Sequence, residues 1–533
     1  MSSSAITSLP AGSRHDIQLH PDALLSETAL RLAVAQQLHL PVAALPDFVI
    51  ERRSIDARGG RVRVQLRLHF ASPPPVDAGP PLREADKGPP VLIVGTGPAG
   101  LFCAYALARQ GIPAVLLERG KPVQPRRRDL AQLNRRGVVD AHSNYCFGEG
   151  GAGTYSDGKL YTRARKRGNV IDVLRILVAH GAPPAILVDA RPHIGSNKLP
   201  KVVAALRHAL TEVGCTFHFG AHVTGLRRNA DGHVRAVELA DGRRLEGRAV
   251  VLATGHSARD VYAMLQAQGI ALEAKDFAVG VRVEHPQPLI NRIQYGPAAG
   301  HPALPAAAYR LATEVDGHGV FSFCMCPGGW IVPASTEAGT LVVNGMSLSK
   351  RDSPFANAGL VVAVQQADLA NVGGGDVLGP GILLQRRLEE TAFAAGGGDL
   401  RAQATRLTDF CAGRASSTVP ATSYIPGLQA TALREVLAAG SPALAVRLQQ
   451  ALRRFGRQMH GYFTEEAVLV GVESRTSAPL RVVRDAATLT APGWPGLYPC
   501  GEGAGYAGGI VSAALDGMRV ATAIVRAGHS VGS

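Results

Sequence analysis

Three glycines at a fixed spacing have the clearest chemical meaning in this chain. Gly95, Gly97 and Gly100 follow an apolar run at 91–94 and precede a helix-like segment at 101–108. In such a unit the first glycine permits a tight turn, the second lets the backbone approach a phosphate, and the third lets the helix pack on the strand. The helix N-terminus adds free N–H groups and a positive dipole end. The spacing therefore predicts a pyrophosphate-binding turn, completed by Thr96, Pro98 and Ala99.

The residues after this turn complete a βαβ unit. A second apolar run at 114–118 ends in Glu118 and is followed by Arg119. An acid at the end of the second strand is placed to accept a hydrogen bond from a ribose 2′-hydroxyl. Strand, glycine turn, helix, strand and terminal acid occur in register, which is much more specific than a glycine triplet alone. The unit predicts a dinucleotide site.

Two later segments decide between the two kinds of dinucleotide. A strand at 249–252 runs into Ala253, Thr254 and Gly255, and the C-terminal region repeats a strand, a turn and a helix. In FAD-binding folds a late acid holds the ribityl chain, here Glu502 after Gly501, and a late helix points its N-terminus at the flavin. That helix would begin at Gly508, Gly509 and Ile510, where its dipole stabilises charge gained on reduction. The alternative for 501–503 is an ordinary polar loop.

A second glycine-rich loop lies at 147–160. Gly150, Gly151 and Gly153 would let backbone N–H groups approach a ligand closely. Lys159 would place a cation near the reduced flavin or the substrate. The alternative is a mobile surface loop.

The substrate-side candidates each have a structural alternative. His285 is a candidate proton donor, or a histidine that caps a turn before Pro286. Glu473 and Arg475 could bind an anionic substrate, or pair with each other. Tyr506 could face the flavin ring, or only pack. Cys324 and Cys326 would face the same side of a strand and could form a peroxidatic or disulfide pair, but the sequence favours buried small hydrophobic residues.

Composition limits the protein class. The chain has 533 residues, 46% of them hydrophobic, and a net charge of +14. No apolar run reaches the length of a membrane span, no signal peptide precedes the first domain, and the seven cysteines include no Cys-x-x-Cys pair. We therefore expect a cytoplasmic protein with no metal site. The positive charge has two explanations, the composition of the source genome or an anionic partner. Basic clusters that could meet such a partner lie at 126–128, 135–136 and 163–167.

The chain divides into four segments. Residues 1–71 predict a βαββ module, because apolar and polar residues alternate in its expected strands. Its helix, at 27–37, would turn Leu30, Leu32 and Ala33 inward. Residues 72–90 are rich in proline and glycine and predict a linker. Residues 91–265 and 465–533 would form a discontinuous FAD-binding domain, and 266–464 an inserted substrate or cap domain. The fold class is α/β, with a split Rossmann-like domain of the glutathione-reductase-like superfamily and an α+β insertion.

Further elements follow from the same patterns. We expect helices at 201–213, 386–395 and 433–454, and strands at 215–219, 234–239, 277–284 and 340–344. Asp241-Gly242 predicts a hairpin turn.

Nearly the whole chain resembles the bacterial FAD-dependent dehydrogenases that share an N-terminal α/β module and a distinctive C-terminal domain. The motifs that carry this resemblance are 54–58, 150–160, 280–287, 323–329, 471–477 and 500–510. The resemblance implies FAD and a redox role, without naming a substrate. The chain departs from its relatives at 353–359, where they are richer in asparagine.

These observations favour an FAD-dependent oxidoreductase that transfers a hydride between the flavin and a small-molecule substrate. An anionic substrate would agree with the positive charge of the chain. The chain has no second glycine fingerprint and no cysteine pair beside the first, which argues against a disulfide reductase with its own NAD(P)H domain. NAD(P)H remains a candidate transient donor. The alternatives are a flavin-dependent RNA-modifying enzyme, for which the lack of interleaved aromatic residues gives no support, and a redox-responsive flavoprotein that binds a protein partner through its N-terminal module.

Overall fold

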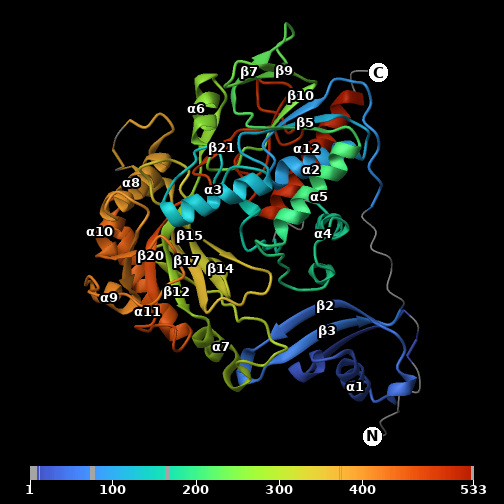
Figure 1. Ribbon diagram of the computed structural model, residues 1–533, viewed down its shortest axis with the longest axis vertical. Helices are drawn as coiled ribbons and strands as arrows, with labels where there is room; N and C mark the ends of the chain where they lie inside the picture. Colours follow the sequence, from blue (N-terminus) through green and yellow to red (C-terminus); the bar gives the residue numbers. More distant parts are fainter. Residues whose placement is uncertain are drawn as a thin grey trace.

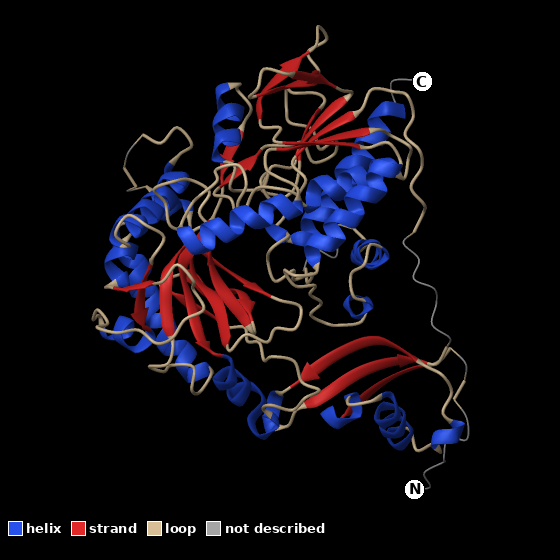
Figure 2. Cartoon of the chain, in the orientation of Figure 1, coloured by secondary structure: helices blue, strands red, loops and turns tan. Residues whose placement is uncertain are grey.

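The computed structural model describes residues 9–10, 12–71, 79–162, 168–370, 372–373 and 375–529. Two large sheets of different construction form the body, and a smaller sheet with its own helix lies beside them (Figure 1). Helices cover the outer side of the seven-stranded sheet, and loops join the two large sheets (Figure 2).

Five short parallel strands form the dinucleotide sheet, in the order β22-β10-β4-β5-β6. Their bounds are β4 Val91–Val94, β5 Ala114–Glu118, β6 Thr216–Phe219, β10 Ala249–Leu252 and β22 Leu497–Pro499. Every residue of β4 and β10 is buried, as expected of parallel strands covered on both faces. Because β22 comes from the C-terminal region yet pairs with β10, the sheet closes only when the chain returns. The split Rossmann-like α/β fold is therefore confirmed.

Helices cover one side of this sheet, and an accessory sheet with one more helix covers the other. α2 (Pro98–Ala108) lies against α12 (Ile510–His529), so closely that a Cβ on Gly517 would come within 2.1 Å of the Ala99 carbonyl oxygen. The other helices of this region are α3 (Val123–Arg136), α4 (Val170–Ala179), α5 (Leu199–Glu212) and α6 (Arg259–Ala267). An accessory sheet contains β7 (Val223–Arg228), β8 (Val234–Leu239) and β9 (Arg244–Glu246). The predicted turn at Asp241-Gly242 joins β8 to β9, an additional short strand that precedes β10.

The inserted domain is built on a seven-stranded sheet of order β13-β14-β17-β12-β20-β18-β19. Its strands are β12 (Phe277–Pro286), β13 (Ala312–Val315), β14 (His318–Cys326), β17 (Phe355–Val364), β18 (Ala402–Arg406), β19 (Leu428–Ala430) and β20 (Val468–Glu473). The hairpin of β15 (Gly329–Pro333) and β16 (Val343–Ser347) lies beside it. β11 (Leu272–Ala274) pairs with β21 (Leu480–Val482) where the chain crosses between domains.

The return to the dinucleotide domain comes later than the sequence indicates. β20 pairs with β12 and β18 of the inserted sheet, so the predicted boundary at 465 is wrong and the crossing follows Glu473. Every residue of β20 is buried. A short apolar run of this kind predicts a buried strand without showing which sheet it joins.

The helices of the inserted domain also refine the sequence prediction. They are α7 (Gln287–Tyr295), α8 (Pro380–Ala395), α9 (Leu407–Ala412), α10 (Leu433–Ala438) and α11 (Pro442–Gln458). The single helix expected at 433–454 is two helices, because Gly440, Ser441 and Pro442 interrupt it. α8 begins six residues before the predicted start, at Pro380, where proline suits a first helical position.

The N-terminal module pairs β1 (Arg14–Leu19) and β2 (Val49–Asp56) with the central β3 (Arg63–His69), and α1 (Glu27–Gln37) lies against them. Leu32 is 47% exposed, so its predicted inward position is wrong; Val34 and Ala35 are buried instead. The outer edge of β2 meets the rest of the chain, since Arg53 exchanges backbone hydrogen bonds with Val188 and Ala190. The Arg53 side chain also pairs with Asp189, with 2.7 Å between the charged atoms.

The segment expected as a linker is bound to the dinucleotide domain over its described part. Backbone N–H groups of Arg83, Ala85 and Asp86 donate to Ala108, Val213 and Gly111, respectively. Residues 72–78 of that segment and the basic cluster at 163–167 lie outside the described residues. Within the described chain, each helix is too short or too polar to cross a bilayer.

Candidate functional site

In the glycine turn after β4, close contacts with the protein backbone require glycine at two of the three positions. Gly95 has φ +104°, and a Cβ there would lie 2.4 Å from the Ala253 carbonyl oxygen. A Cβ on Gly100 would lie 2.0 Å from the Gly95 carbonyl oxygen. These two glycines are needed for the fold whether or not a ligand is bound.

Gly97 differs from its two neighbours in the motif. Its backbone is extended, with φ −68° and ψ −179°, which any residue adopts. Among the described residues beyond its chain neighbours, a Cβ there would approach only Gly151 Cα, at 3.9 Å. Protein packing therefore leaves an open space over Gly97, at the N-terminus of α2, where N–H groups lack intrahelical partners. This open space fits a pyrophosphate, and Pro98 and Ala99 begin the helix beneath it.

The second glycine loop lies against the first. Gly150 donates its N–H to the Thr96 carbonyl oxygen, and a Cβ on Gly151 would lie 3.1 Å from Gly97 Cα. Arg126 holds this loop from behind, because its buried guanidinium donates to four carbonyl oxygens, those of Asn144, Tyr145, Glu149 and Gly151. Arg126 is thus a buried anchor, although the sequence suggests a surface basic cluster at 126–128.

Glu118 lies under the turn as predicted, with a full set of protein partners. Its carboxylate accepts from the Thr96 N–H and hydroxyl and from the N–H groups of Gly120 and Gly148. These four donors match the four lone-pair sites of a carboxylate. Glu118 therefore joins both glycine loops, and a ribose hydroxyl would have to replace one of these donors. Arg119 turns away to pair with Asp260, at 2.9 Å.

The strand ends from the two halves of the domain meet beside these loops. A Cβ on Gly501 would lie 2.7 Å from Ala99 Cβ, and one on Gly503 would lie 2.3 Å from the Gly255 carbonyl oxygen. Gly153 faces Ile510 at the start of α12, where its Cβ would lie 3.1 Å away. Gly508, Gly509 and Gly255 face open space. The fold thus brings the predicted segments 95–100, 150–153, 253–255, 501–502 and 508–510 to one edge of the sheet.

Glu502 lies between two basic side chains in this edge. Its carboxylate is 3.4 Å from His256 Nδ1. Burial raises the pKa of Glu502, while His256 and Lys275 oppose that shift and a charge on Cys324 adds to it. Cys324 therefore lies within electrostatic reach of the acid expected to hold the ribityl chain.

A cluster of side chains from both domains lies beyond Glu502; we call Asp157, Lys159, Arg282, Cys324 and Cys326 the thiol cluster. Lys159 Nζ is 3.6 Å from Cys324 Sγ, 3.3 Å from Cys326 Sγ and 2.9 Å from the Asp157 carboxylate. Arg351 also pairs with Asp157, at 2.5 Å. Lys159 thus meets a cysteine pair that is 165 residues away in the sequence.

The electrostatics of the thiol cluster separate the two cysteines. A hydrogen bond from Cys326 lowers the pKa of the Cys324 thiol well below its ordinary value, aided by Lys159 and Arg282 against the effect of burial. The same hydrogen bond, together with burial, raises the pKa of Cys326. Burial disfavours the charged form of Lys159, but the two sulfurs and Asp157 outweigh it and raise the pKa of this lysine. Both sulfurs therefore have a cationic partner, which the expectation of buried small hydrophobic residues does not include.

Glu473 and Arg282 form a buried ion pair beside the cysteines, with 2.7 Å between Arg282 Nη1 and Glu473 Oε1. Arg282 also donates to Asn357 and to the Cys324 carbonyl oxygen. Burial raises the pKa of Glu473 to about 7, although Arg282 opposes the shift. Its second oxygen, Oε2, finds no hydrogen-bond donor among the described residues.

Glu473 and Arg475 do not pair with each other. Arg475 forms a two-pronged pair with the buried Glu389 and donates to Thr336. Tyr506 donates to the Val482 carbonyl oxygen and packs under Arg484, whose guanidinium carbon is 3.7 Å from the ring centre. These contacts favour the packing alternative for Tyr506 and a structural role for Arg475.

His285 lies in the core of the inserted domain. Its Nε2 is 2.9 Å from the Tyr462 carbonyl oxygen, and its ring packs against Tyr309 and Tyr462. Burial lowers the pKa of His285 to about 4, so the ring is neutral. Because side chains alternate along β12, His285 faces the opposite side from Arg282. Neither predicted role, proton donor or turn cap, agrees with this position.

Sequence reasoning missed Arg282, Asp157, Arg351 and Asn357. A signal existed for Arg282, since a charge in the apolar run 277–283 needs a buried partner. Asn357 lies in β17, within the segment 353–359 where the sequence indicates a departure from the family pattern. Asp157 and Arg351 carry no comparable local signal.

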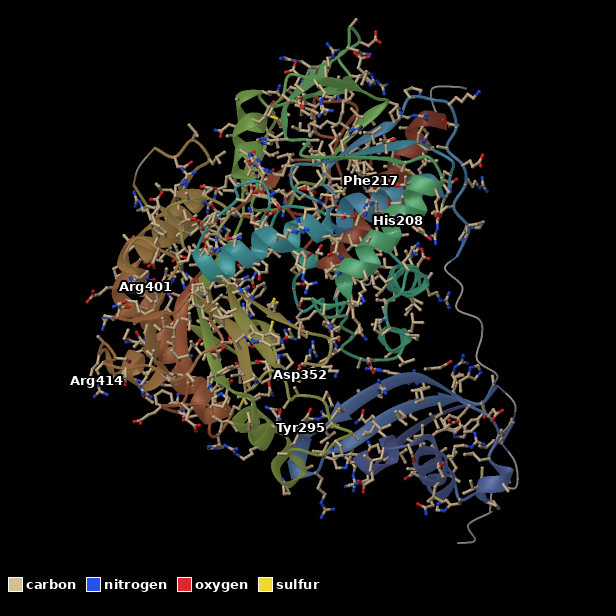
Figure 3. The ribbon with its side chains drawn as sticks, in the orientation of Figure 1. His208, Phe217, Tyr295, Asp352, Arg401 and Arg414 are labelled. Carbon is tan, nitrogen blue, oxygen red and sulfur yellow. The ribbon has the colours of Figure 1, made fainter. Side chains whose placement is uncertain are left out.

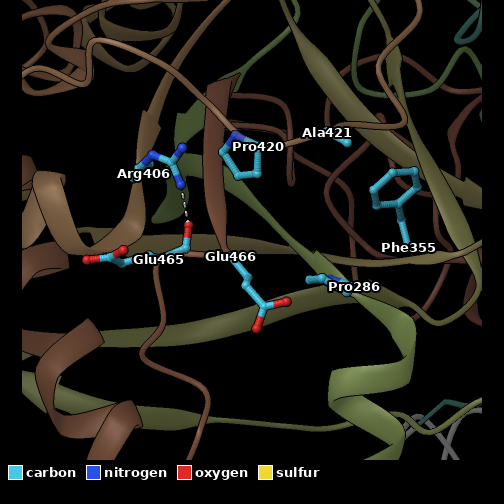
Figure 4. A pocket seen from close by; sticks show the side chains of 7 residues that line it. All are labelled: Pro286, Phe355, Arg406, Pro420, Ala421, Glu465 and Glu466. Atoms are coloured by element: carbon cyan, nitrogen blue, oxygen red, sulfur yellow. Dashed lines mark hydrogen bonds between the residues drawn. The ribbon is translucent and has the colours of Figure 1, made fainter.

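A surface hollow lies away from these residues. It holds about 350 Å³ and is lined by Pro286, Phe355, Arg406, Pro420, Ala421, Glu465 and Glu466 (Figure 4). None of these residues belongs to the glycine loops or the thiol cluster. Exposed arginines of the inserted domain also have local partners: Arg401 and Arg414 point outward and pair with Asp399 and Asp409 (Figure 3).

Comparisons with known proteins agree with this arrangement. Residues 276–476 match the model of the "FAD-dependent protein, C-terminal domain-like" family, 198–322 match "FAD dependent oxidoreductase" and 89–141 match "FAD binding domain". Residues 13–71 match a domain of unknown function. A protein from Clostridium beijerinckii, described as uncharacterized, is 41% identical over 449 residues, which cover 83% of this chain and 81% of the relative.

The solved structures give only weak matches. Glycine oxidase from Geobacillus kaustophilus is 14% identical over 82% of this chain and 94% of its own, with a TM-score of 0.33. CtdE in complex with FAD is 10% identical over 83% and 89%, with a TM-score of 0.32. These scores are low, and the family is established by the sequence relative and the family models. The chain belongs to the FAD-dependent oxidoreductases that carry the FAD-dependent protein C-terminal domain.

Proposed function

We propose that the protein transfers a hydride between its bound FAD and a small polar or anionic molecule that binds at the thiol cluster. The observation that carries this proposal is the position of the cluster. Lys159 extends from the second glycine loop, and Cys324 lies within electrostatic reach of Glu502. A substrate there would meet residues of both domains next to the flavin.

Charge in the cluster supports a polar substrate. Three cations, Lys159, Arg282 and Arg351, lie in or beside the cluster together with two acids, Asp157 and Glu473, and burial raises the pKa of Glu473 to about 7. One third of the Lys159 side chain is exposed. In this proposal FAD supplies two-electron chemistry, while the chain binds and orients the substrate and sets the local field.

The first test concerns the cofactor. Purified protein should contain FAD, and Gly97→Val should lose it, because a side chain would fill the open space over Gly97. Gly373→Val is the matched control, since Gly373 also faces open space but lies in a distant loop. A colourless protein that FAD does not reconstitute would contradict the proposal.

The second test concerns the reductant. Anaerobic protein is mixed with NADH, NADPH or a metabolite panel, and bleaching of the flavin absorbance is followed. We expect a nicotinamide to act as a transient donor and a small oxidised molecule to restore the absorbance. Failure of every donor to bleach the bound flavin would refute hydride transfer while leaving FAD binding intact.

A further inference from the structure

We propose that Cys324 and Cys326 are a redox-active pair that cycles between a thiolate with a thiol and an intramolecular disulfide, with small-molecule disulfides as the substrate class. This inference deepens the proposed function and rests on it. It starts from three observations: the backbone at Cys324, the different surroundings of the two sulfurs, and the cation shared between them.

The backbone at Cys324 is the first observation. Its φ is +44°, one of five non-glycine residues in the left-handed region within the described chain. The pairing of β14 with β17 shifts register between Phe323 and Cys326, so the kink lies in a bulge. Bulges and left-handed non-glycine residues persist where the surrounding structure enforces them, often to aim a side chain at a reacting centre.

The two cysteines differ in their surroundings. Cys326 is buried, while Cys324 is partly exposed as a residue. Cys326 Sγ lies 3.3 Å from the Cys324 carbonyl oxygen, to which its thiol donates, and the pKa shifts have the same sense, lowered at Cys324 and raised at Cys326. A thiolate on the more exposed residue beside a thiol on the buried one is the arrangement that thiol–disulfide exchange needs, because the thiolate attacks and the second sulfur resolves.

Lys159 is shared by both sulfurs, at 3.6 Å and 3.3 Å. A cation in this place stabilises a thiolate on either sulfur, so it serves both halves of the exchange. Arg282 adds a second cation, since its Nη2 lies 2.8 Å from the Cys324 carbonyl oxygen and 3.8 Å from Cys326 Sγ.

The exchange itself balances between the disulfide substrate and the two cysteines. The Cys324 thiolate attacks one sulfur of R–S–S–R, the S–S bond breaks, RS⁻ departs, and a mixed disulfide remains on Cys324. Cys326 then attacks Cys324 Sγ as its proton passes to the second leaving sulfur, which departs as RSH. A reduced flavin, when bound, would supply the two electrons and one proton that return the Cys324–Cys326 disulfide to a thiolate and a thiol.

The experiment uses holoprotein under argon and 5,5′-dithiobis(2-nitrobenzoate) as the disulfide probe. Wild type should rapidly release two thionitrobenzoates per chain and lose two hydrogens in intact mass, with no adduct. Cys326→Ser should release one and retain one adduct, while Cys324→Ser should lose the rapid phase. Cys146→Ser, at the other partly exposed cysteine, is the matched control and should behave as wild type.

The role of Lys159 has its own readout. Lys159→Met should move the pH profile of the rapid phase to higher pH, and Lys159→Arg should largely restore it. One thionitrobenzoate with a retained adduct in wild type, or a rapid phase that survives Cys324→Ser, would overturn the proposal. These outcomes are independent of flavin bleaching, so the pair and the hydride transfer can fail separately.

Discussion

Two buried carboxylates of the inserted domain have opposite surroundings. Glu389 on α8 accepts five hydrogen bonds: two from Arg259, two from Arg475 and one from Ser474. Glu473 on β20 accepts one, from Arg282, and its Oε2 has no donor among the described residues. Burial acts on both acids, but two arginines lower the pKa of Glu389 to about 2, whereas that of Glu473 rises to about 7.

This difference separates a residue that joins domains from one that lies at the reaction site proposed above. Arg259 belongs to α6 of the dinucleotide domain, so Glu389 connects the two large domains through a fully satisfied ion cluster. Glu473 instead lies next to the thiol cluster with an unfilled oxygen. Groups with strongly perturbed pKa values and incomplete bonding tend to lie at functional sites.

The largest expected effect comes from breaking the Glu389 cluster. Glu389→Gln removes the closest counter-charge of two buried arginines, leaves Arg259 with Glu337 at 4.0 Å, and should lower the free energy of unfolding by about 3–5 kcal/mol. Urea unfolding followed by circular dichroism measures this loss. Glu390→Gln, at the exposed neighbouring position on the same helix, is the control and should stay within about 0.5 kcal/mol of wild type. Equal losses in the two variants would show that Glu389 does not join the domains.

The next effect concerns the pH dependence of Glu473. Its pKa is raised in the folded state, so its contribution to stability is fully present below about 4.5 and is lost as the pH rises through about 7. Over that window wild type should lose stability relative to Glu473→Gln by at most about 1.4 kcal/mol per pH unit. Urea midpoints at pH 5, 6, 7 and 8 test this. If the urea midpoints of the two proteins changed in parallel with pH, burial would not raise the pKa of Glu473.

Glu389 should show the opposite sign. Its lowered pKa stabilises the folded protein above pH 4.5 and loses that effect as the pH falls toward 2. Acid unfolding of wild type should therefore begin in the window where Glu389 takes up its proton. The two carboxylates thus predict a stability maximum between their titration ranges.

Sequence reasoning was effective where a site is made by the backbone of a short segment. The turn at 95–100 has its strand, glycines and helix in one continuous stretch, so each local preference points to the same structure. Gly97 is the clearest case. Contacts within the protein do not require glycine there, whereas the dinucleotide motif does, because a phosphate would lie over this position. The return at 501–510 was predictable for the same reason.

The thiol cluster and the Glu389 cluster could not be found this way. Arg282 and Glu473 are 191 residues apart, and Arg259 and Glu389 are 130 apart. Neighbouring sequence places Glu389 on a helix, but the partner of a buried charge is chosen by tertiary packing. Glycines make room for these pairs: a Cβ on Gly359 would lie 2.4 Å from Glu473 Oε2, a constraint that appears only in the folded sheet.

The smallest expected effect lies between the two carboxylates, at Ser474. Its hydroxyl donates to Glu389 Oε1 at 2.7 Å, while its carbonyl oxygen accepts from Gln385. Ser474→Ala removes one of five hydrogen bonds to Glu389 and keeps the backbone contact, so we expect a loss of about 1 kcal/mol in urea unfolding. The pH dependence assigned to Glu473 should be unchanged, although the two residues are adjacent in the chain. If Ser474→Ala flattened that dependence, the two carboxylates would form one coupled network, and the distinction between a joining site and a reaction site would fail.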